Sequence, residues 1–314
     1  MATVFTVFGQ ITVLLTLRPE DSITDHLFIA TERYDYFTVS WDREKRTIRN
    51  ERPARDFSDR FLRSADYGAK YISDPQSRML GLHIYQGIFT IIPLIQQPGK
   101  TGKKGQKAKS LAPGELVGDM CEPSPIRLQE LRVLDIVFLD TPETTVAMLY
   151  EDGLNKVHLQ IYKVKASGKG PRGGLVRDAE LEEIDIDQFD GRNLDPFSKF
   201  IIPVPASTGM RLGFLRAWCG YARLTNLSIG GMLILGEQTI AYISASGKLK
   251  KQSLTDPTVF STWGRVNDTR YLLGDDYGKL YSLILDVLEI QGQVDIIVTY
   301  IGEVRRLLSL PTLI

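Results

Sequence analysis

The amino-acid sequence predicts an all-β fold, namely a partial, WD40-like β-propeller. The first observation is a recurring β-hairpin pattern, in which apolar strand residues flank a turn rich in glycine or charge. The second is that a single hairpin is marginally stable in water, so repeated small sheets must bury their faces against each other, as propeller blades do. Hairpins of this kind are predicted at 26–42, 78–94, 146–165, 231–244 and 270–286.

Residues 270–286, RYLLGDDYGKLYSLILD, show the pattern most clearly. Tyr271, Leu273, Leu280 and Leu283 occupy positions typical of buried strands on the two sides of an Asp/Gly turn. The five hairpins follow each other at irregular intervals, and the Trp-Asp pair typical of WD40 repeats occurs once, at Trp41-Asp42. We therefore expect divergent blades joined by loops of unequal length.

Composition predicts a globular chain and argues against several function classes. The 314 residues are 43% hydrophobic, which supports a packed core. Lys plus Arg equal Asp plus Glu at 38 each, so no overall electrostatic field favours nucleic acid or an acidic membrane. The cysteines, Cys121 and Cys219, have neither disulfide nor metal-site spacing, which suits a reducing compartment. No apolar run is long enough to predict a transmembrane helix.

The residues that could carry chemistry show no recognisable catalytic pattern. His26, His83 and His158 have no zinc-site spacing, and we expect each to be structural. Asp135, inside an apolar run, is expected at a turn or a sheet edge. We therefore expect no catalytic residues, no cofactor, no metal and no small-molecule substrate, but an interaction scaffold. A propeller hydrolase with two carboxylates from different blades stays open as an alternative.

Three charged segments are expected to be loops. Residues 96–125 and 166–198 are predicted to be mobile loops, the first rich in Gly, Pro and Lys and the second acidic in its later part. The lysines of the first could assist nuclear import or a weak nucleic-acid contact, although a plain solvated loop is the preferred interpretation. Residues 42–66 carry seven arginines and form either a solvated loop or a basic rim that binds a partner: Arg43, Arg46, Arg49, Arg52, Arg55, Arg60 and Arg63.

Several segments resemble a family of large multi-propeller scaffolds. This family comprises DNA damage-binding protein 1, the largest cleavage and polyadenylation specificity subunit and the third subunit of splicing factor 3b, and the resemblance is to the first propeller of the DNA damage-binding branch. Together the matching segments span most of residues 9–303. They are GQITVLLTLRP (9–19), DPQSRMLGLHIYQGIFTIIPL (74–94), IRLQELRVLDIVFL (126–139), GGMLILGEQTIAYI (230–243) and RYLLGDDYGKLYSLIL (270–285).

The resemblance implies a seven-bladed first propeller, incomplete here, in a nuclear and partly cytoplasmic adaptor of a cullin-4 RING ubiquitin ligase that acts in DNA repair and protein turnover. WD40-type substrate receptors would bind a cleft between propellers, and the arginines that match the family's cleft-facing positions are Arg60 and Arg63. Damaged DNA or RNA would be contacted weakly or indirectly. A scaffold of a polyadenylation or splicing complex is the alternative within the same family.

Two stretches depart from the family pattern. Between Thr208 and Gly230 the resemblance calls for a short turn, and the codons of 209–229 can encode the donor, branch point and acceptor of a retained intron of fungal type. Glu303-Val304-Arg305 can encode another donor, so 304–314 is expected to be a non-homologous tail. We therefore expect a partial propeller over 1–303, from a gene model truncated at both ends.

Overall fold

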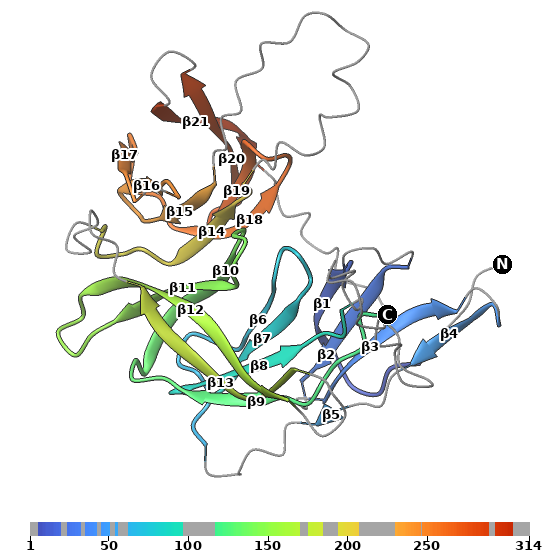
Figure 1. Ribbon diagram of the computed structural model, residues 1–314. Helices are drawn as coiled ribbons and strands as arrows, with labels where there is room; N and C mark the ends of the chain where they lie inside the picture. The colour runs from blue at the N-terminus through green and yellow to red at the C-terminus, as the bar shows by residue number, and fades with distance from the viewer. Residues whose placement is uncertain are drawn as a thin grey trace, which may run out of the picture. The chain divides into compact units, whose positions relative to one another are not determined.

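The computed structural model describes residues 6–19, 24–32, 35–42, 45–50, 54–55, 62–96, 117–169, 175–184, 194–206, 230–245, 247–288 and 293–303. These residues form twenty-one β-strands in five antiparallel sheets (Figure 1). The predicted all-β class is confirmed, and the five sheets are blades of a β-propeller. The structure has five blades, so the expected count of seven is not confirmed.

Each blade is a meander, in which strands adjacent in sequence are adjacent in the sheet (Figure 1). Blade 1 has a small fifth strand that pairs with its third: β1 (Ile11–Leu17), β2 (His26–Thr31), β3 (Asp35–Asp42), β4 (Thr47–Asn50) and β5 (Ala54–Arg55). Blade 2 contains β6 (Lys70–Ser73), β7 (Met79–His83), β8 (Ile88–Pro93) and β9 (Ser124–Arg127). Blade 3 contains β10 (Arg132–Leu139), β11 (Thr145–Glu151), β12 (Val157–Lys169) and β13 (Leu175–Ile184).

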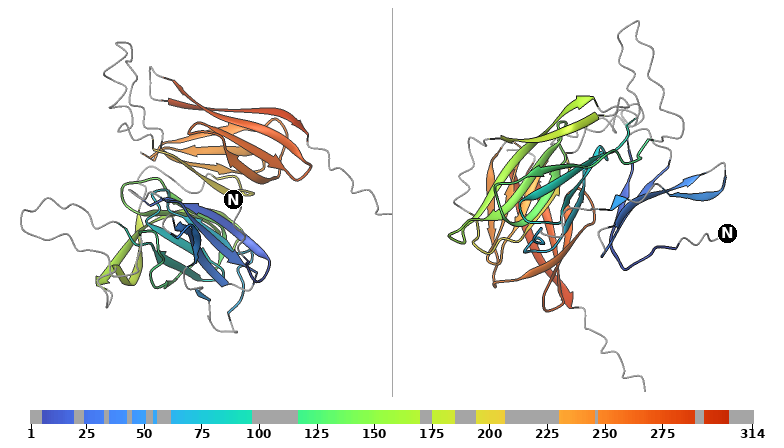
Figure 2. Two further views of the ribbon diagram at one scale, coloured as in Figure 1. Left: turned by 90° about the vertical axis from the view of Figure 1, so that its right-hand side faces the viewer. Right: turned by 90° about the horizontal axis from the view of Figure 1, so that it is seen from below.

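The last two blades follow the same plan. Blade 4 contains β14 (Phe200–Val204), β15 (Gly231–Leu235), β16 (Thr239–Ile243) and β17 (Leu249–Ser253). Blade 5 contains β18 (Phe260–Arg265), β19 (Arg270–Asp275), β20 (Lys279–Leu288) and β21 (Gln293–Glu303). The long β20–β21 pair is visible in Figure 2. All five predicted hairpins are confirmed, because each coincides with the second and third strands of a blade.

The meander order fixes which connections share an end of a blade. Because neighbouring strands are antiparallel, the turn between the second and third strands lies at the same end as the start of the first strand and the finish of the fourth. We call this the entry end. Connections from one blade to the next therefore meet the central turns at the entry end.

The chain divides into two compact units. Unit 1 comprises Met1–Phe138 and Tyr162–Glu183, and unit 2 comprises Leu139–Ile161 and Ile184–Ile314. The boundary runs through the third sheet. Blades 1 and 2 thus belong to unit 1, and blades 4 and 5 belong to unit 2.

The core of unit 1 joins blades 1 and 2. Leu17 and Phe28 of blade 1 are fully buried in one cluster with Leu80 and Ile92 of blade 2. Successive side chains along a strand point to opposite faces of the sheet, so every second side chain reaches this cluster. Arg78 and Asp74 close the β6–β7 turn with charge-assisted hydrogen bonds of 2.7 and 2.8 Å, which involve both carboxylate oxygens.

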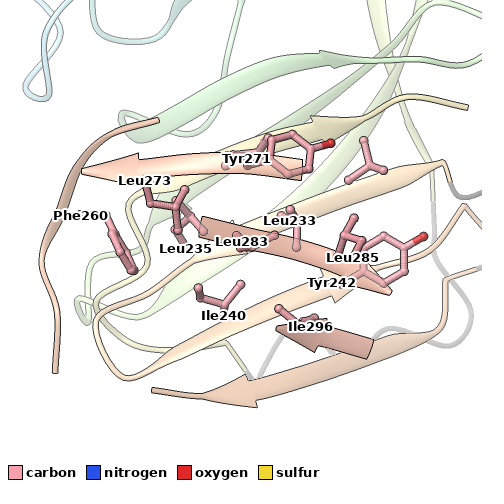
Figure 3. Packing of buried hydrophobic residues seen from close by; sticks show 12 residues of the cluster. Leu233, Leu235, Ile240, Tyr242, Phe260, Tyr271, Leu273, Leu283, Leu285 and Ile296 are labelled. Carbon is pink, nitrogen blue, oxygen red and sulfur yellow. The ribbon is translucent and has the colours of Figure 1, made fainter. Parts of the chain in front are cut away.

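The core of unit 2 joins blades 4 and 5 (Figure 3). Of the four residues predicted to be buried in this hairpin, Tyr271, Leu273 and Leu283 are fully buried, whereas Leu280 is partly exposed. Tyr242 also lies in this cluster, and its hydroxyl donates to the Gly230 carbonyl at 2.7 Å. Burial raises the pKa of both Tyr242 and Tyr271 to about 12, so both phenols are neutral at physiological pH.

All three segments expected to be loops contain strands. Residues 175–184 form β13, and β12 continues to Lys169, so the prediction of a loop over 166–198 is wrong for these residues. The acidic residues of β13 lie on the outermost strand of blade 3, where exposed positions carry charge as readily as a loop does. Likewise β9 begins at Ser124, inside the interval 96–125, and β4 lies within the arginine-rich interval 42–66. Residues 97–116, 209–229 and 304–314 lie outside the described residues.

Across the described residues, no helix is long and apolar enough to cross a membrane.

Candidate functional site

Of the arginines expected to bind a partner, Arg60 lies outside the described residues and Arg63 lies at the entry end of blade 2. Arg63 belongs to the segment 62–69, which leads into β6. Leu62 packs against the core of unit 1 at the start of this segment. Arg63 therefore follows directly after a residue anchored in the core.

Backbone hydrogen bonds fasten this segment to the β7–β8 turn. The Ala65 N–H donates to the Ile84 carbonyl at 2.9 Å, and the Gln86 N–H donates to the Arg63 carbonyl at 3.0 Å. Ile84 is itself buried in the unit 1 core. These two hydrogen bonds form an isolated β-bridge between Ser64 and Tyr85, which holds the backbone at Arg63 against the turn.

The Arg63 side chain points outward. It is 75% exposed, and its guanidinium lies 3.1 Å from the Asp66 carboxylate. An exposed ion pair of this kind contributes about 0 to 1 kcal/mol to stability, so the fold does not depend on it. The Arg63 guanidinium is available to a partner.

Tyr67 lies at the entry end of blade 2, and Arg132 lies at the entry end of blade 3. Arg132 Nη2 donates to the Tyr67 hydroxyl at 3.2 Å, which connects the first residue of β10 to the segment 62–69. Leu131 precedes Arg132 and lies over the turn glycine Gly87, where an added β-carbon would come 3.1 Å from Leu131 Cδ2. The Leu128 N–H donates to the Gly87 carbonyl at 2.9 Å, which fixes this connection to the turn.

These contacts assemble one surface, which we call the Arg63 patch: Arg63, Asp66, Tyr67, Leu131 and Arg132. Tyr67 is 41% exposed and Leu131 is 57% exposed, although the backbone around both is hydrogen-bonded. Tyrosine and arginine are enriched among the residues that dominate binding energy at protein interfaces. The patch therefore has the composition and the rigidity of a protein-docking surface.

The three histidines differ in their surroundings. His26 is buried, and burial lowers its pKa below the ordinary value; the nearby Arg49 charge acts in the same direction, and the Asp119 charge opposes both. His83 Nδ1 donates to the Ile88 carbonyl at 2.9 Å, and burial lowers its pKa as well. His158 Nε2 lies 2.9 Å from Asp152 Oδ2 in the β11–β12 turn. Within the described ranges, no group of three or more His, Cys, Asp or Glu side chains could hold a metal ion.

Asp135 lies on β10, which forms one edge of the blade 3 sheet. It is buried and its carboxylate lies 3.7 Å from Lys70 Nζ, an ion pair between two strands of unit 1. This location agrees with the sheet-edge position expected from the sequence. The nearby charge of Lys70 accounts for a carboxylate in an otherwise apolar strand.

Sequence reasoning identified Arg63 by resemblance and missed Tyr67, Leu131 and Arg132. A signal for Tyr67 was present, because Asp66-Tyr67-Gly68 is a turn-forming sequence directly before a strand. Leu131 and Arg132 gave no comparable signal, because their position depends on how the β9–β10 connection packs on Gly87. That packing becomes apparent only when the pairing of the strands is known.

Comparisons with known proteins identify a matching family model and several similar relatives. The family model described as the RSE1/DDB1/CPSF1 first beta-propeller matches residues 1–313. DNA damage-binding protein 1 of Oryza sativa subsp. japonica is 32% identical over 300 residues, which cover 95% of this chain and 22% of that protein. DNA damage-binding protein 1a of Arabidopsis thaliana is 33% identical over 89% of this chain and 21% of its own length. DNA damage-binding protein 1 of Schizosaccharomyces pombe is 28% identical over a region that covers 88% of this chain and 22% of that protein. The chain thus spans about a fifth of the length of the curated relatives it matches.

Proposed function

The chain belongs to the RSE1/DDB1/CPSF1 first beta-propeller family, and on this premise we propose that it is a non-catalytic protein-interaction scaffold. The observation that carries the proposal is the Arg63 patch. Its Tyr67 and Leu131 side chains are exposed on backbone that hydrogen bonds hold in place, so binding would cost little conformational entropy.

The finer proposal is that the intact protein is the adaptor of a cullin-4 RING ubiquitin ligase in DNA repair and protein turnover. In this role the Arg63 patch contacts WD40-type substrate receptors, and the Arg63 guanidinium binds a receptor carboxylate. The relatives' shared name, DNA damage-binding protein 1, supports a nuclear location and this branch of the family over polyadenylation or splicing. Damaged DNA or RNA would be contacted indirectly through a receptor.

Quantitative affinity purification of the full-length protein tests this proposal. We expect wild-type protein to recover cullin-4 and WD40-type receptors, and a variant with Arg63→Glu and Tyr67→Ser to recover fewer receptors with cullin-4 unchanged. Recovery of polyadenylation or splicing subunits in place of cullin-4 would assign the protein to the other branch. If the wild type and the variant recover receptors equally, the Arg63 patch is not the receptor-binding surface.

A seven-bladed propeller is also part of the proposal. Leu272 of β19 and Ile297 of β21 lie on the face of blade 5 that points away from the unit 2 core, and they are 41% and 44% exposed. An apolar sheet face of this kind is expected to pack against further β-structure.

We further propose that codons 209–229 are a retained intron and that residues 304–314 are translated from a second unspliced intron. Long-read sequencing of complementary DNA tests this proposal. A transcript that skips codons 209–229 and continues past Glu303 supports it, whereas a transcript that encodes the sequence as printed contradicts it.

A further inference from the structure

The strand β21 (Gln293–Glu303) forms the outer edge of blade 5. Among the strands that the structure describes, β21 pairs with β20 alone, and its other side carries no neighbouring strand. An edge strand directs alternate backbone N–H and C=O groups away from its sheet, where another chain can pair with them. In a propeller the fourth strand of a blade is the outer one, so β21 offers a row of backbone hydrogen-bonding groups.

The fourth strands of the other blades carry features that discourage such pairing. Charged residues do so in β4, β13 and β17, whereas β9 is four residues long and contains Pro125. The strand β21 differs, because its residues Ile296–Gly302 (IIVTYIG) include neither a charge nor a proline. Most of them are β-branched or aromatic, which favours a strand. We call the stretch Ile296–Gly302 the β21 edge.

The backbone of the β21 edge is held in place by β20. The two strands pair without interruption from Gln293, opposite Leu288, to Tyr300, opposite Tyr281, and the register shifts only beyond Tyr300. Ile296 is buried in the unit 2 core, which holds this part of β21 from one face. Because β21 is already ordered, its pairing with an incoming strand would restrict only the incoming strand.

A ladder of aromatic rings crosses blade 5 and ends at the β21 edge. The ring centroids of Phe260 and Tyr281 lie 5.8 Å apart, and those of Tyr281 and Tyr300 lie 5.7 Å apart, both in edge-to-face geometry. Phe260 is buried, whereas Tyr300 is 53% exposed. Tyr281 and Tyr300 are direct cross-strand partners. An aromatic or β-branched side chain on an added strand would therefore continue the ladder at Tyr300.

The further blades proposed above would leave the β21 edge free. They would pack on the face of blade 5 that carries Leu272 and Ile297, because propeller blades stack face to face. The free hydrogen-bonding groups of β21 point along the plane of the sheet, whereas the side chains of that face stand perpendicular to it. The β21 edge and the blade face are therefore separate surfaces.

The charges at the two ends of the β21 edge indicate the chemistry of its partner. Asp295 precedes the edge, lies 2.6 Å from Lys250 Nζ and is paired in register with Asp286. Glu303 follows the edge and is paired in register with Lys279. The carboxylates at both ends disfavour an acidic partner. The uncharged stretch between them offers no counter-charge to an ionised side chain of either sign, so it fits an uncharged strand.

A second copy of the chain fits this edge poorly. Antiparallel pairing of Ile296–Gly302 with itself places Asp295 of each copy opposite Glu303 of the other. Like charges directly opposite each other destabilise a sheet. We propose that the β21 edge binds an extended, uncharged segment of a partner protein, rich in β-branched and aromatic residues, as an added strand of blade 5. This proposal rests on the proposed scaffold function, and its residues belong to unit 2, whereas the Arg63 patch belongs to unit 1.

A random peptide display library, selected on the immobilised full-length protein, tests the proposal. We expect the enriched peptides to be rich in β-branched and aromatic residues and to lack acidic ones. An enriched peptide is then synthesised with a single backbone N-methyl group at each position in turn. Methylation removes one N–H donor, so binding should weaken about tenfold at every second position and change little at the positions between.

Three tyrosine variants locate the bound peptide on β21. The Tyr300→Ser variant should bind about fivefold more weakly or worse, because the added strand loses its contact at the end of the aromatic ladder. The Tyr300→Phe variant keeps the ring and should bind as the wild type does. Tyr277→Ser is the matched control, because Tyr277 is 79% exposed in the β19–β20 turn of the same blade, outside β21. Circular dichroism and urea unfolding confirm that each variant is folded.

The proposal is overturned if no peptide is enriched, if N-methylation shows no alternating effect, or if the Tyr300→Ser variant binds every enriched peptide as tightly as the wild type. Analytical ultracentrifugation tests for the other occupant. A dimer that dissociates in the Tyr300→Ser variant and persists in the Tyr277→Ser variant would assign the β21 edge to a second copy, which would also overturn the proposal.

The Arg63 patch and the β21 edge can fail separately. If receptor recovery depends on Arg63 and Tyr67 while no peptide binding depends on Tyr300, the proposed function stands and the β21 edge is rejected. If peptide binding depends on Tyr300 and alternates with N-methylation while receptor recovery is unaffected by Arg63→Glu and Tyr67→Ser, the reverse holds.

Discussion

Gly81 of β7 faces the ring of Phe89 of β8. A β-carbon added at Gly81 would come 2.6 Å from Phe89 Cζ and 2.9 Å from Ile72 Cγ1, on strands to either side. Phe89 is fully buried, so the ring cannot move without disturbing its own packing. We predict that Gly81→Ala lowers the free energy of unfolding by about 1 to 3 kcal/mol, as overpacked cores do. Urea unfolding followed by circular dichroism measures this loss.

Gly264→Ala is the control for this substitution. Gly264 also lies in a β-strand, but no atom lies within 4 Å of the position its β-carbon would take. Its replacement should change the free energy of unfolding by about 0.5 kcal/mol or less. Equal losses for the two variants would show that the close contact at Gly81 is not the cause.

Removing Arg78 alone should destabilise the protein more than removing the charges of both Arg78 and Asp74. The Asp74 side chain is fully buried, and the Arg78 side chain is 21% exposed. Arg78→Leu should therefore cost about 3 to 5 kcal/mol, because it leaves a buried carboxylate without its counter-charge. The double variant Asp74→Asn with Arg78→Leu should be more stable than Arg78→Leu alone, since the uncompensated charge is gone. A double variant as unstable as the sum of the two single variants would contradict this explanation.

The buried histidines predict lower stability in mild acid. Burial lowers the pKa of His26 and His83 in the folded chain, so the unfolded chain binds protons more readily between the lowered pKa and the ordinary value of about 6.5. The stabilisation is complete above that ordinary value and is lost as pH falls below it. The urea midpoint should therefore decrease between about pH 7 and pH 5.

His26→Gln and His83→Gln separate the contributions of the two histidines. Each substitution should reduce the steepness of the urea midpoint against pH, because glutamine does not bind a proton in this range. Measurement of the slope, as opposed to the midpoint itself, keeps the test valid even where a variant is less stable overall. An unchanged slope in both variants would assign the pH dependence to other groups.

Asp152 provides a direct test of the geometry of the β11–β12 turn. Hydrogen bonds from the Lys156 N–H, from His158 and from the Leu154 N–H hold its pKa at about 2, below the ordinary 3.8. Carbon-13 NMR titration of the Asp152 carboxyl should show this low value, and His158→Gln should raise it towards the ordinary one. A wild-type titration close to the ordinary value would show that the turn is not closed as described.

The central hairpins were predictable because their chemistry is local. Apolar alternation and an Asp/Gly turn identify β19–β20 from sequence alone, since both strands are buried in the blade. The outer strands were not predictable in this way. The strand β17, with the sequence LKKQS, exposes four of its five side chains, and the acidic β13 exposes three of the six that are described, so their composition resembles that of a loop.

The Arg63 patch depends on contacts that composition does not encode. Tyr67 and Arg132 are far apart in sequence and meet because β6 and β10 both start at entry ends.

Site-specific photocrosslinking from position 67 tests the scaffold account most directly. A photoreactive phenylalanine analogue replaces Tyr67 in the full-length protein, and the same analogue at Val266 serves as the control, because Val266 is exposed on a different surface. The account predicts that position 67 crosslinks to a WD40-type receptor and that position 266 does not. Failure of position 67 to capture a receptor, in cells where the receptor is recovered with the intact protein, would contradict the assignment of the Arg63 patch as the docking surface.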